Sequence, residues 1–193
     1  MLKQLIIYGI FIAIGYYVIG AYNENKALQE YDTTMDELRQ SAEKYPDVTE
    51  TEAIAIEARK MASKRFSGGK GDKINAAAMF YGFKYRHVVG YAKYCRKYNL
   101  PVDNYISAFN DYYQSETASI NKILNRDVRS KLDNIIDEDV MRMIKIEFRD
   151  STSQYEITEE QICTAMNIPA QAESIIRATD FKKQLPQAYA LIL

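Results

Sequence analysis

The stretch KINAAAMFYGFKYRHVVGYAKYCRKY, residues 73–98, organises the rest of the chain. Seven of its residues recur at alternating spacings of four and three, and they predict a continuous apolar seam along one helix face: Ile74, Ala78, Tyr81, Tyr85, Val88, Ala92 and Cys95. Gly82 and Gly90 lie on another face. An internal helix glycine costs about 1 kcal/mol relative to alanine, so close packing against these two positions is expected. We therefore predict that this helix is central to the fold.

The side of this helix away from the seam is basic and rich in tyrosine. Six residues there are predicted to form a surface platform for stacking or anion binding: Tyr91, Lys93, Tyr94, Arg96, Lys97 and Tyr98. The alternative interpretation is that these rings pack beneath neighbouring helices and leave only their hydroxyl groups at the edge.

His87 is the only histidine in the chain. A general base needs a carboxylate or a nucleophile within reach, but the neighbours of His87 at helical spacing are Phe83, Lys84, Gly90 and Tyr91. The cationic surroundings also disfavour its protonated form. We interpret His87 as a surface or helix-interface residue and assign no catalytic residue.

Helical periodicity continues on both sides of this segment, and no sustained strand pattern occurs. Thr49 with Glu52, and Thr158 with Gln161, have the spacing of capping boxes, while Pro169 is typical of a first helical position. The helices expected besides the central one are residues 24–45, 49–66, 103–125, 127–148, a short helix from 158 and a last helix from 169. The sequence therefore predicts an all-α, bundle-like domain of five or six helices.

Three local features add detail to this prediction of helices. The acidic run at 137–139 is expected to bend or divide its helix, and the polar DSTSQ sequence at 150–154 is expected to end it. The apolar C-terminal sequence ALIL, residues 190–193, is expected to dock on the core.

The N-terminal segment has the character of a membrane span. Residues 5–22 are uncharged and almost wholly apolar, and at about 1.5 Å per residue they extend roughly 27 Å, close to the thickness of a hydrocarbon core. Lys3 on the short side favours an orientation that leaves the rest of the chain outside the cytosol. The alternative is a secretory signal that is cleaved.

The resulting organisation has three parts. Residues 1–23 are a membrane anchor or signal sequence, residues 24–46 a helical stalk or first helix, and residues 47–193 a helical extracytoplasmic domain. The expected location is the bacterial inner membrane, single-pass, with the C-terminal domain in the periplasm, or secretion if the signal is cleaved. Gly9 and Ala13 form a small-xxx-small pair that would permit a homodimer, although lipid-facing small residues explain them as well.

The net charge of −1 conceals strong segmentation. Residues 23–58 carry a net charge of −7, residues 59–97 carry +10, and residues 98–193 carry −5. A basic segment between two acidic ones favours charge pairing within the molecule. The other candidates are anionic lipid headgroups, anionic envelope polymers and, least favoured, nucleic acid.

The two cysteines, Cys95 and Cys163, belong to no CxxC or cysteine–histidine cluster. With one histidine in the chain, neither a metal site nor a cofactor is predicted. In an oxidising compartment, a Cys95–Cys163 disulfide is expected, and it would close a loop of 67 intervening residues. Two buried free thiols are the alternative, and a cytosolic location would favour them.

These features favour a non-enzymatic, membrane-tethered binding or scaffold protein of the cell envelope. Its partner is expected to be a protein or an anionic envelope component. One alternative is a glycan-directed hydrolase with two helix-borne carboxylates, for which six acids are available: Asp111, Glu116, Asp137, Glu138, Asp139 and Glu147. The other is a cytosol-facing binder of nucleic acid or anionic lipid.

Overall fold

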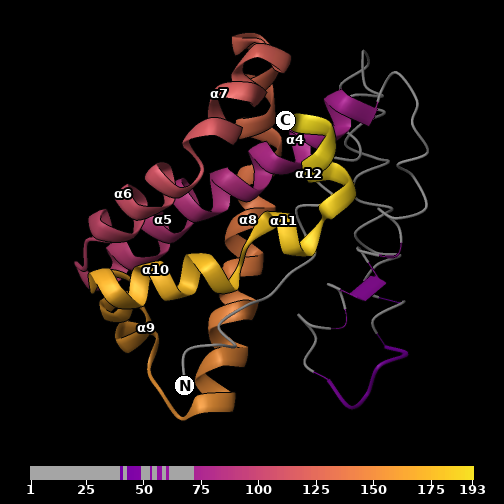
Figure 1. Ribbon diagram of the computed structural model, residues 1–193. Coiled ribbons are helices and arrows are strands. Elements are labelled where there is room, and N and C mark those ends of the chain that lie inside the picture. Colours follow the sequence, from indigo (N-terminus) through magenta and orange to yellow (C-terminus); the bar gives the residue numbers. More distant parts are fainter. Residues whose placement is uncertain (1–39, 41–42, 49–52, 54–55, 58–59, 61–71) are drawn as a thin grey trace.

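The computed structural model describes residues 40, 43–48, 53, 56–57, 60 and 72–193. Within these residues every regular element is a helix and no strand occurs, which confirms the all-α prediction (Figure 1). The predicted anchor at 5–22, with Gly9 and Ala13, lies outside the described residues, as do most of the stalk and of the helix at 49–66. In the described part of the chain, no helix combines the length and the apolar character that a membrane crossing requires.

Residues 72–98 form one almost unbroken rod, and the other helices pack around it. The rod is built from α4 (Asp72–Tyr85), the π-helix η2 (Arg86–Gly90), α5 (Tyr91–Cys95) and the short 3-10 helix η3 (Arg96–Tyr98). The helices around it are α6 (Asp103–Tyr112), α7 (Gln114–Ile123), α8 (Arg126–Tyr155), α9 (Glu159–Met166), α10 (Pro169–Ala178), α11 (Phe181–Gln184) and α12 (Pro186–Ile192).

The rod is central, as predicted, but one part of it, in α4, is buried all round rather than along one seam. Five consecutive residues of α4, Ala76 to Phe80, have no exposed surface. At 100° per residue they cover the whole circumference of the helix, so neighbours must enclose it on every side. These neighbours are α7, α8 and α12. Ile74, the first residue of the predicted seam, is 38% exposed because it precedes this enclosed part.

The rod contains one π-helical turn. The backbone N–H of Tyr91 donates to the carbonyl oxygen of Arg86, five residues earlier, so this turn is wider than an α-helical turn. Along the rod the buried face is an aromatic one, in which Phe80, Phe83, His87, Tyr91 and Tyr94 recur three or four residues apart. Val88 and Ala92 of the predicted seam lie off this face and are only half-buried.

Two of the predicted helices have different boundaries. The helix expected over 103–125 divides at Tyr113, whose ring packs inward against Phe80, Phe83 and Phe109 at centroid distances of 5.5, 5.5 and 4.8 Å. The helix expected over 127–148 instead continues without a break from Arg126 to Tyr155.

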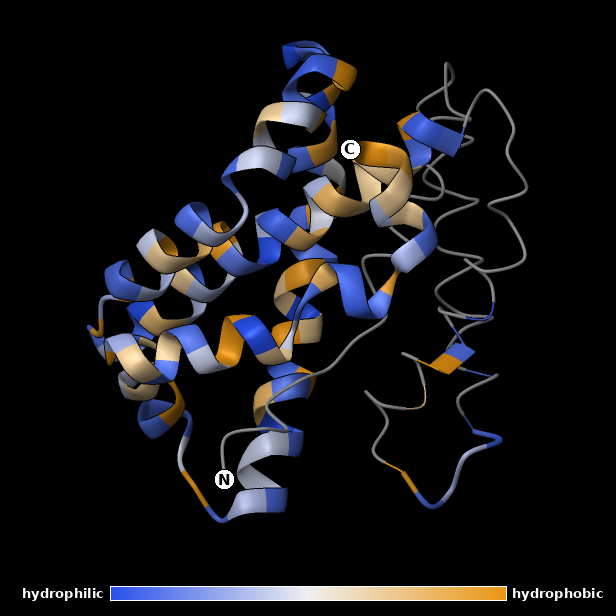
Figure 2. Ribbon diagram, in the orientation of Figure 1, coloured by the Kyte–Doolittle hydropathy of each residue, from blue (hydrophilic) through white to orange (hydrophobic). Residues whose placement is uncertain are grey.

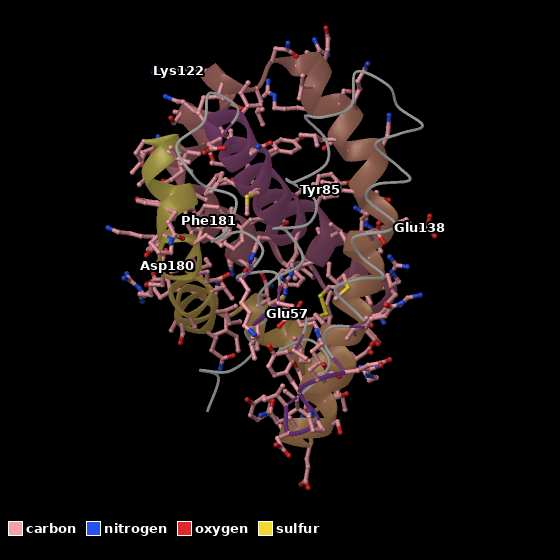
Figure 3. The ribbon with its side chains drawn as sticks, turned by 90° about the vertical axis from the view of Figure 1, so that its right-hand side faces the viewer. Glu57, Tyr85, Lys122, Glu138, Asp180 and Phe181 are labelled. Atoms are coloured by element: carbon pink, nitrogen blue, oxygen red, sulfur yellow. A yellow bond between two sulfur atoms is a disulfide. The ribbon has the colours of Figure 1, made fainter. Side chains whose placement is uncertain are left out.

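The expected breaks in α8 are absent for local reasons. In the acidic run, Asp139 pairs with Arg142 one turn later, and Glu138 projects from the outer side of the helix (Figure 3). In the DSTSQ sequence, the hydroxyl of Thr152 donates to the carbonyl oxygen of Arg149 at 2.8 Å, and Ser151 is buried. The Thr152 hydroxyl bonds within the helix and so does not compete with it, while the buried Ser151 hydroxyl has no hydrogen-bond partner among the described residues.

The C-terminal region confirms the predicted helix starts and adds two more. Thr158 and Gln161 form the capping box of α9, and Pro169 opens α10. Asp180 then caps α11, and Pro186 opens α12, so α9 is not the penultimate helix. The mostly hydrophobic α12 packs on α4, and Ile192 is fully buried (Figure 2). The docking predicted for the C-terminal sequence is therefore confirmed at Ile192, whereas the terminal Leu193 is 65% exposed.

Gly90 confirms the expected close approach. A Cβ atom at this position would lie 2.6 Å from Ile144 Cδ1 and 2.8 Å from Val140 Cγ1, both side-chain atoms of α8. Any larger residue would therefore require these side chains, or η2 itself, to shift.

We expect Gly90→Ala to lower the free energy of unfolding by about 1–3 kcal/mol, because overpacking outweighs the gain in helix propensity. Urea unfolding of the full-length protein, followed by far-ultraviolet circular dichroism, measures this. In a Val140→Ala background the same substitution should cost less, since one of the clashing methyl groups is gone. Equal costs in the two backgrounds would contradict the proposed contact.

Candidate functional site

The predicted disulfide is present. Cys95 at the end of α5 and Cys163 on α9 are joined with an S–S distance of 2.02 Å and a Cα–Cα distance of 5.6 Å. Both residues are fully buried in the hydrophobic core. The bond therefore ties the central rod to the C-terminal helices at a point that solvent does not reach.

Three residues of the predicted binding platform converge on one carboxylate beside this bond. Glu159, the first residue of α9, accepts hydrogen bonds from Lys97 Nζ at 2.6 Å, from the Tyr94 hydroxyl at 2.9 Å and from the Tyr98 hydroxyl. Lys97 Nζ also lies 3.6 Å from the centroid of the Tyr94 ring. Burial raises the pKa of Glu159, but these three donors outweigh burial and leave the pKa below its ordinary value.

Lys93 is paired in the same way with the long helix α8. Its Nζ lies 2.5 Å from Asp137 Oδ1, which also accepts from the Tyr85 hydroxyl at 2.7 Å. Tyr85 is seen on the rod beside α8 in Figure 3. The hydrogen bonds from Lys93 and Tyr85 hold the pKa of Asp137 below its ordinary value. For Lys93 and Lys97, the interpretation that basic residues pair within the molecule is thus confirmed.

The predicted platform is only partly at the surface. Tyr91 has no exposed surface and Tyr94 is 4% exposed, so their expected placement as surface rings is wrong. Both rings lie on the same helix face as the buried Phe83 and His87, and this face points into the core. Lys93, Arg96 and Lys97 are exposed and Tyr98 is half-buried. Binding of a partner by these four residues stays a prediction.

Beneath the platform, a charged pair is enclosed in the core. Arg86 of η2 and Glu147 of α8 form an ion pair, and their side chains are 5% and 3% exposed. The Tyr91 hydroxyl donates to the same carboxylate, at 2.9 Å from Oε1 and 3.2 Å from Oε2. Burial raises the pKa of Glu147, and the charge and hydrogen bonds of Arg86, together with Tyr91, limit that rise. Glu147, one of the candidate acids for glycan cleavage, is therefore a core residue.

His87 is also enclosed, so of the two positions that we considered, the helix interface is confirmed and the surface is not. It has no exposed surface, and its ring stacks on Phe109 at a centroid distance of 4.9 Å. Its Nδ1 is hydrogen-bonded to the Tyr105 hydroxyl, while Nε2 has no hydrogen-bond partner among the described residues. Burial, and secondly the positive charge of Arg86, hold the pKa of His87 well below its ordinary value. The neutral imidazole acts as an aromatic core residue.

A second constellation, which the sequence did not indicate, lies between α6–α7 and α11–α12. We call it the tyrosine–carboxylate pocket. It has a volume of about 660 Å³ and is lined by Tyr112, Tyr113, Glu116, Asp180, Lys182, Lys183, Pro186 and Tyr189. Figure 3 shows Asp180 beside Phe181, where α10 gives way to α11.

Two buried carboxylates form the polar floor of this pocket. Glu116 is 5% exposed and accepts from the Tyr189 hydroxyl at 2.8 Å, while Asp180 is 7% exposed and accepts from the Tyr113 hydroxyl at 3.3 Å. Burial, the hydrogen bond with Glu116 and the negative charge of Asp180 together raise the pKa of Tyr189 to about 12. Only tertiary packing brings these acids together, because they are far apart in the sequence.

Removal of the disulfide should destabilise the protein strongly. The cross-link closes a loop with a sequence separation of 68, and the chain-entropy model gives such a loop about 4 kcal/mol of stabilisation. We expect Cys95→Ala/Cys163→Ala to lose about that amount in urea unfolding relative to the oxidised wild type. Wild type under reducing conditions is the matched control and should lose a similar amount. A loss below about 1 kcal/mol in both would show that the cross-link contributes little.

Stability should fall on acidification because of His87. Its folded pKa lies below the ordinary value of 6.5, so the unfolded chain binds the extra proton first and stability decreases as the pH falls through 6.5. We expect a loss of about 1.4 kcal/mol between about pH 7.5 and pH 5.5. The control is His87→Gln, which does not titrate, so its stability should lack this component. Parallel pH profiles for the two proteins would contradict the enclosed, neutral state of His87.

Comparison of the chain with protein families, curated proteins and solved structures gives no match. The described residues also contain no group of three His, Cys, Asp or Glu side chains that could hold a metal ion. Function is therefore argued from two features of the described residues: the disulfide with the paired charges around it, and the tyrosine–carboxylate pocket.

Proposed function

We propose that this chain is a membrane-tethered, extracytoplasmic binding or scaffold protein of the bacterial cell envelope, without catalytic activity. In this proposal residues 5–22 anchor the chain in the inner membrane, and the helical domain lies in the periplasm. The partner is a protein or an anionic envelope component. The observation that carries the proposal is the enclosed Cys95–Cys163 disulfide.

A disulfide in this position fits an oxidising compartment. Cytosolic thiols are kept reduced, whereas disulfides form and persist in the periplasm and outside the cell. Because both cysteines have no exposed surface, small thiols reach the bond only when the core opens. This favours a permanent structural cross-link over a bond that exchanges during function.

The paired charges support binding rather than catalysis. Asp137 and Glu159 each accept hydrogen bonds from a lysine and from at least one tyrosine, and His87 is enclosed in its neutral form. Hydrogen bonds within the protein thus occupy the two carboxylates, and the core encloses His87, whereas a general acid or base must be free to reach the substrate. Arg96 and the exposed parts of Lys93 and Lys97 leave a rigid cationic edge for an acidic partner.

The two alternative functions, a binder of nucleic acid or lipid and a glycan-directed hydrolase, differ in how well the structure supports them. A nucleic-acid or lipid binder needs several cations for phosphate groups, and the ion pairs of Lys93 and Lys97 reduce the number that the rod offers. A glycan-directed hydrolase has one observation in its favour, which is that Glu116 and Asp180 line the same pocket. It stays the second candidate.

The proposal predicts that both cysteines are oxidised in intact cells that express the full-length chain. Cells are treated with acid, denatured and exposed to a mass-tagged maleimide with and without prior reduction. We expect no label before reduction, two labels after it, no covalent dimer, and recovery of the protein with its N-terminal segment in the membrane fraction.

A Cys163→Ser variant is the matched control. It leaves Cys95 without its partner, so this one cysteine should take up label before reduction and show that the reagent reaches it. Free labelling of both cysteines in the wild type would overturn the extracytoplasmic assignment. Recovery in the soluble periplasmic fraction without residues 1–22 would overturn the tether and support the cleaved signal.

A further inference from the structure

We propose that the tyrosine–carboxylate pocket is a binding site for an uncharged, polyhydroxylated ligand, that is, a saccharide unit. The proposal deepens the binding function proposed above by assigning the site and the chemical class of its ligand. It rests on the chain being a binding protein, and it does not depend on how the chain is tethered.

The pocket presents hydrogen-bond acceptors on its floor and donors at its rim. Both oxygens of Glu116 are oriented, Oε1 by the Tyr189 hydroxyl and Oε2 by the Ser115 hydroxyl, each at 2.8 Å. Carboxylate oxygens have further lone pairs and can each accept a second hydrogen bond. The exposed Lys182 and Lys183 supply ammonium donors that line the same pocket. A hydroxyl group, which both donates and accepts, matches this arrangement.

The charge of the lining selects against ionic ligands. Glu116 and Asp180 contribute two negative charges, and Lys182 and Lys183 contribute two positive charges. A cation attracted to the carboxylates would be repelled by the lysines. An anion attracted to the lysines would be repelled by the carboxylates. Electrostatic complementarity therefore favours a ligand without net charge.

Tyr112 gives the site an aromatic surface and an exchangeable hydrogen bond. It is 40% exposed, and its hydroxyl donates to Asp180 Oδ2 at a long 3.4 Å. A ligand hydroxyl can replace such a weak bond at little cost. The apolar C–H face of a sugar ring can pack on the Tyr112 ring, where it would take the place of the exposed Arg177 guanidinium, whose Cζ lies 5.8 Å from the ring centroid.

The site has room for a ligand longer than one sugar unit. On the other side of Tyr112, a second hollow of about 440 Å³ lies between α6 and α10, lined in part by Asn104, Asp111 and Arg177. Both volumes fall in the range of small-molecule sites. Because the two hollows share Tyr112, this ring lies at the boundary between two subsites.

The lining does not suit a peptide. Peptide recognition uses apolar side-chain pockets or the edge of a sheet. In the tyrosine–carboxylate pocket, Pro186 is the one lining residue without a polar group in its side chain, and the elements around it are helices.

Binding is tested by isothermal titration calorimetry on the full-length protein in a detergent without a sugar headgroup, such as a dodecyl amine oxide. The probes are chitotetraose and maltotetraose, with trilysine and triglutamate as charged controls. We expect at least one saccharide to bind with a Kd that changes less than twofold when salt is raised from about 50 to about 300 mM, since uncharged ligands are little affected by screening. The charged peptides should not bind.

Two substitutions locate the site. Tyr112→Ala and Glu116→Gln should each weaken saccharide binding at least tenfold, because the first removes the ring and the second replaces a strong acceptor by an amide. Lys145→Ala, an exposed change on α8 and away from the pocket, is the matched control and should bind as wild type. Retained circular dichroism and an intact disulfide exclude unfolding as the cause of any loss.

The proposal is overturned if neither saccharide binds to the wild type. If the saccharide binds but neither Tyr112→Ala nor Glu116→Gln weakens its binding, the ligand binds elsewhere on the protein, and the proposal is overturned as well. Binding of trilysine that Glu116→Gln abolishes would show a cation site instead. None of these results bears on the state of the cysteines in cells, so failure of this proposal and failure of the tethered, extracytoplasmic location are distinguishable.

Discussion

The enclosed ion pair between Arg86 and Glu147 is the constraint on which the rest of the structure depends. A charge in a core is tolerated only when it is paired, and loss of one partner typically costs about 3–5 kcal/mol. The pair therefore restricts how the central rod can be rotated against α8. In this rotation Gly90 faces α8, the Tyr91 hydroxyl reaches Glu147, and Cys95 faces α9. Arg86, His87 and Tyr91, within and beside the π-turn, all lie in the interior.

The same rotation explains why two lysines of the rod add little to a basic surface. Lys93 meets Asp137 of α8, and Lys97 meets Glu159 of α9. Exposed pairs of this kind contribute little stability, but they cancel the field that a row of unpaired lysines would create. A partner that uses this face must match a short cationic edge around Arg96 and compete with the internal acids for the lysines. The tyrosine–carboxylate pocket, by contrast, offers polar groups on the surface with balanced charge.

Sequence reasoning succeeded where a feature depends on nearby residues. The Thr158–Gln161 capping box, the Pro169 helix start and the inward C-terminus all follow from local chemistry, and the structure has them. The pairing of Cys95 with Cys163 could be predicted because the chain has no other cysteine. Reasoning failed where polar residues that usually end a helix are satisfied within it. The acidic run and the DSTSQ sequence look like helix ends, yet α8 continues through both, because Asp139 pairs with Arg142 and the Thr152 hydroxyl donates to the carbonyl oxygen of Arg149.

By itself, therefore, the sequence determined the helical class, the central position of residues 73–98 and the cysteine pair, since these follow from periodicity, capping and composition. Only the tertiary structure decided which tyrosines are buried, which lysines are neutralised and which acids share a pocket. The physical reason is that these outcomes depend on partners far along the chain, such as Arg86 and Glu147, 61 residues apart, or Tyr189 and Glu116, 73 residues apart. On the rod, two faces have helical spacing, and only the packed neighbours decide that the one with Phe83, His87 and Tyr91 points inward.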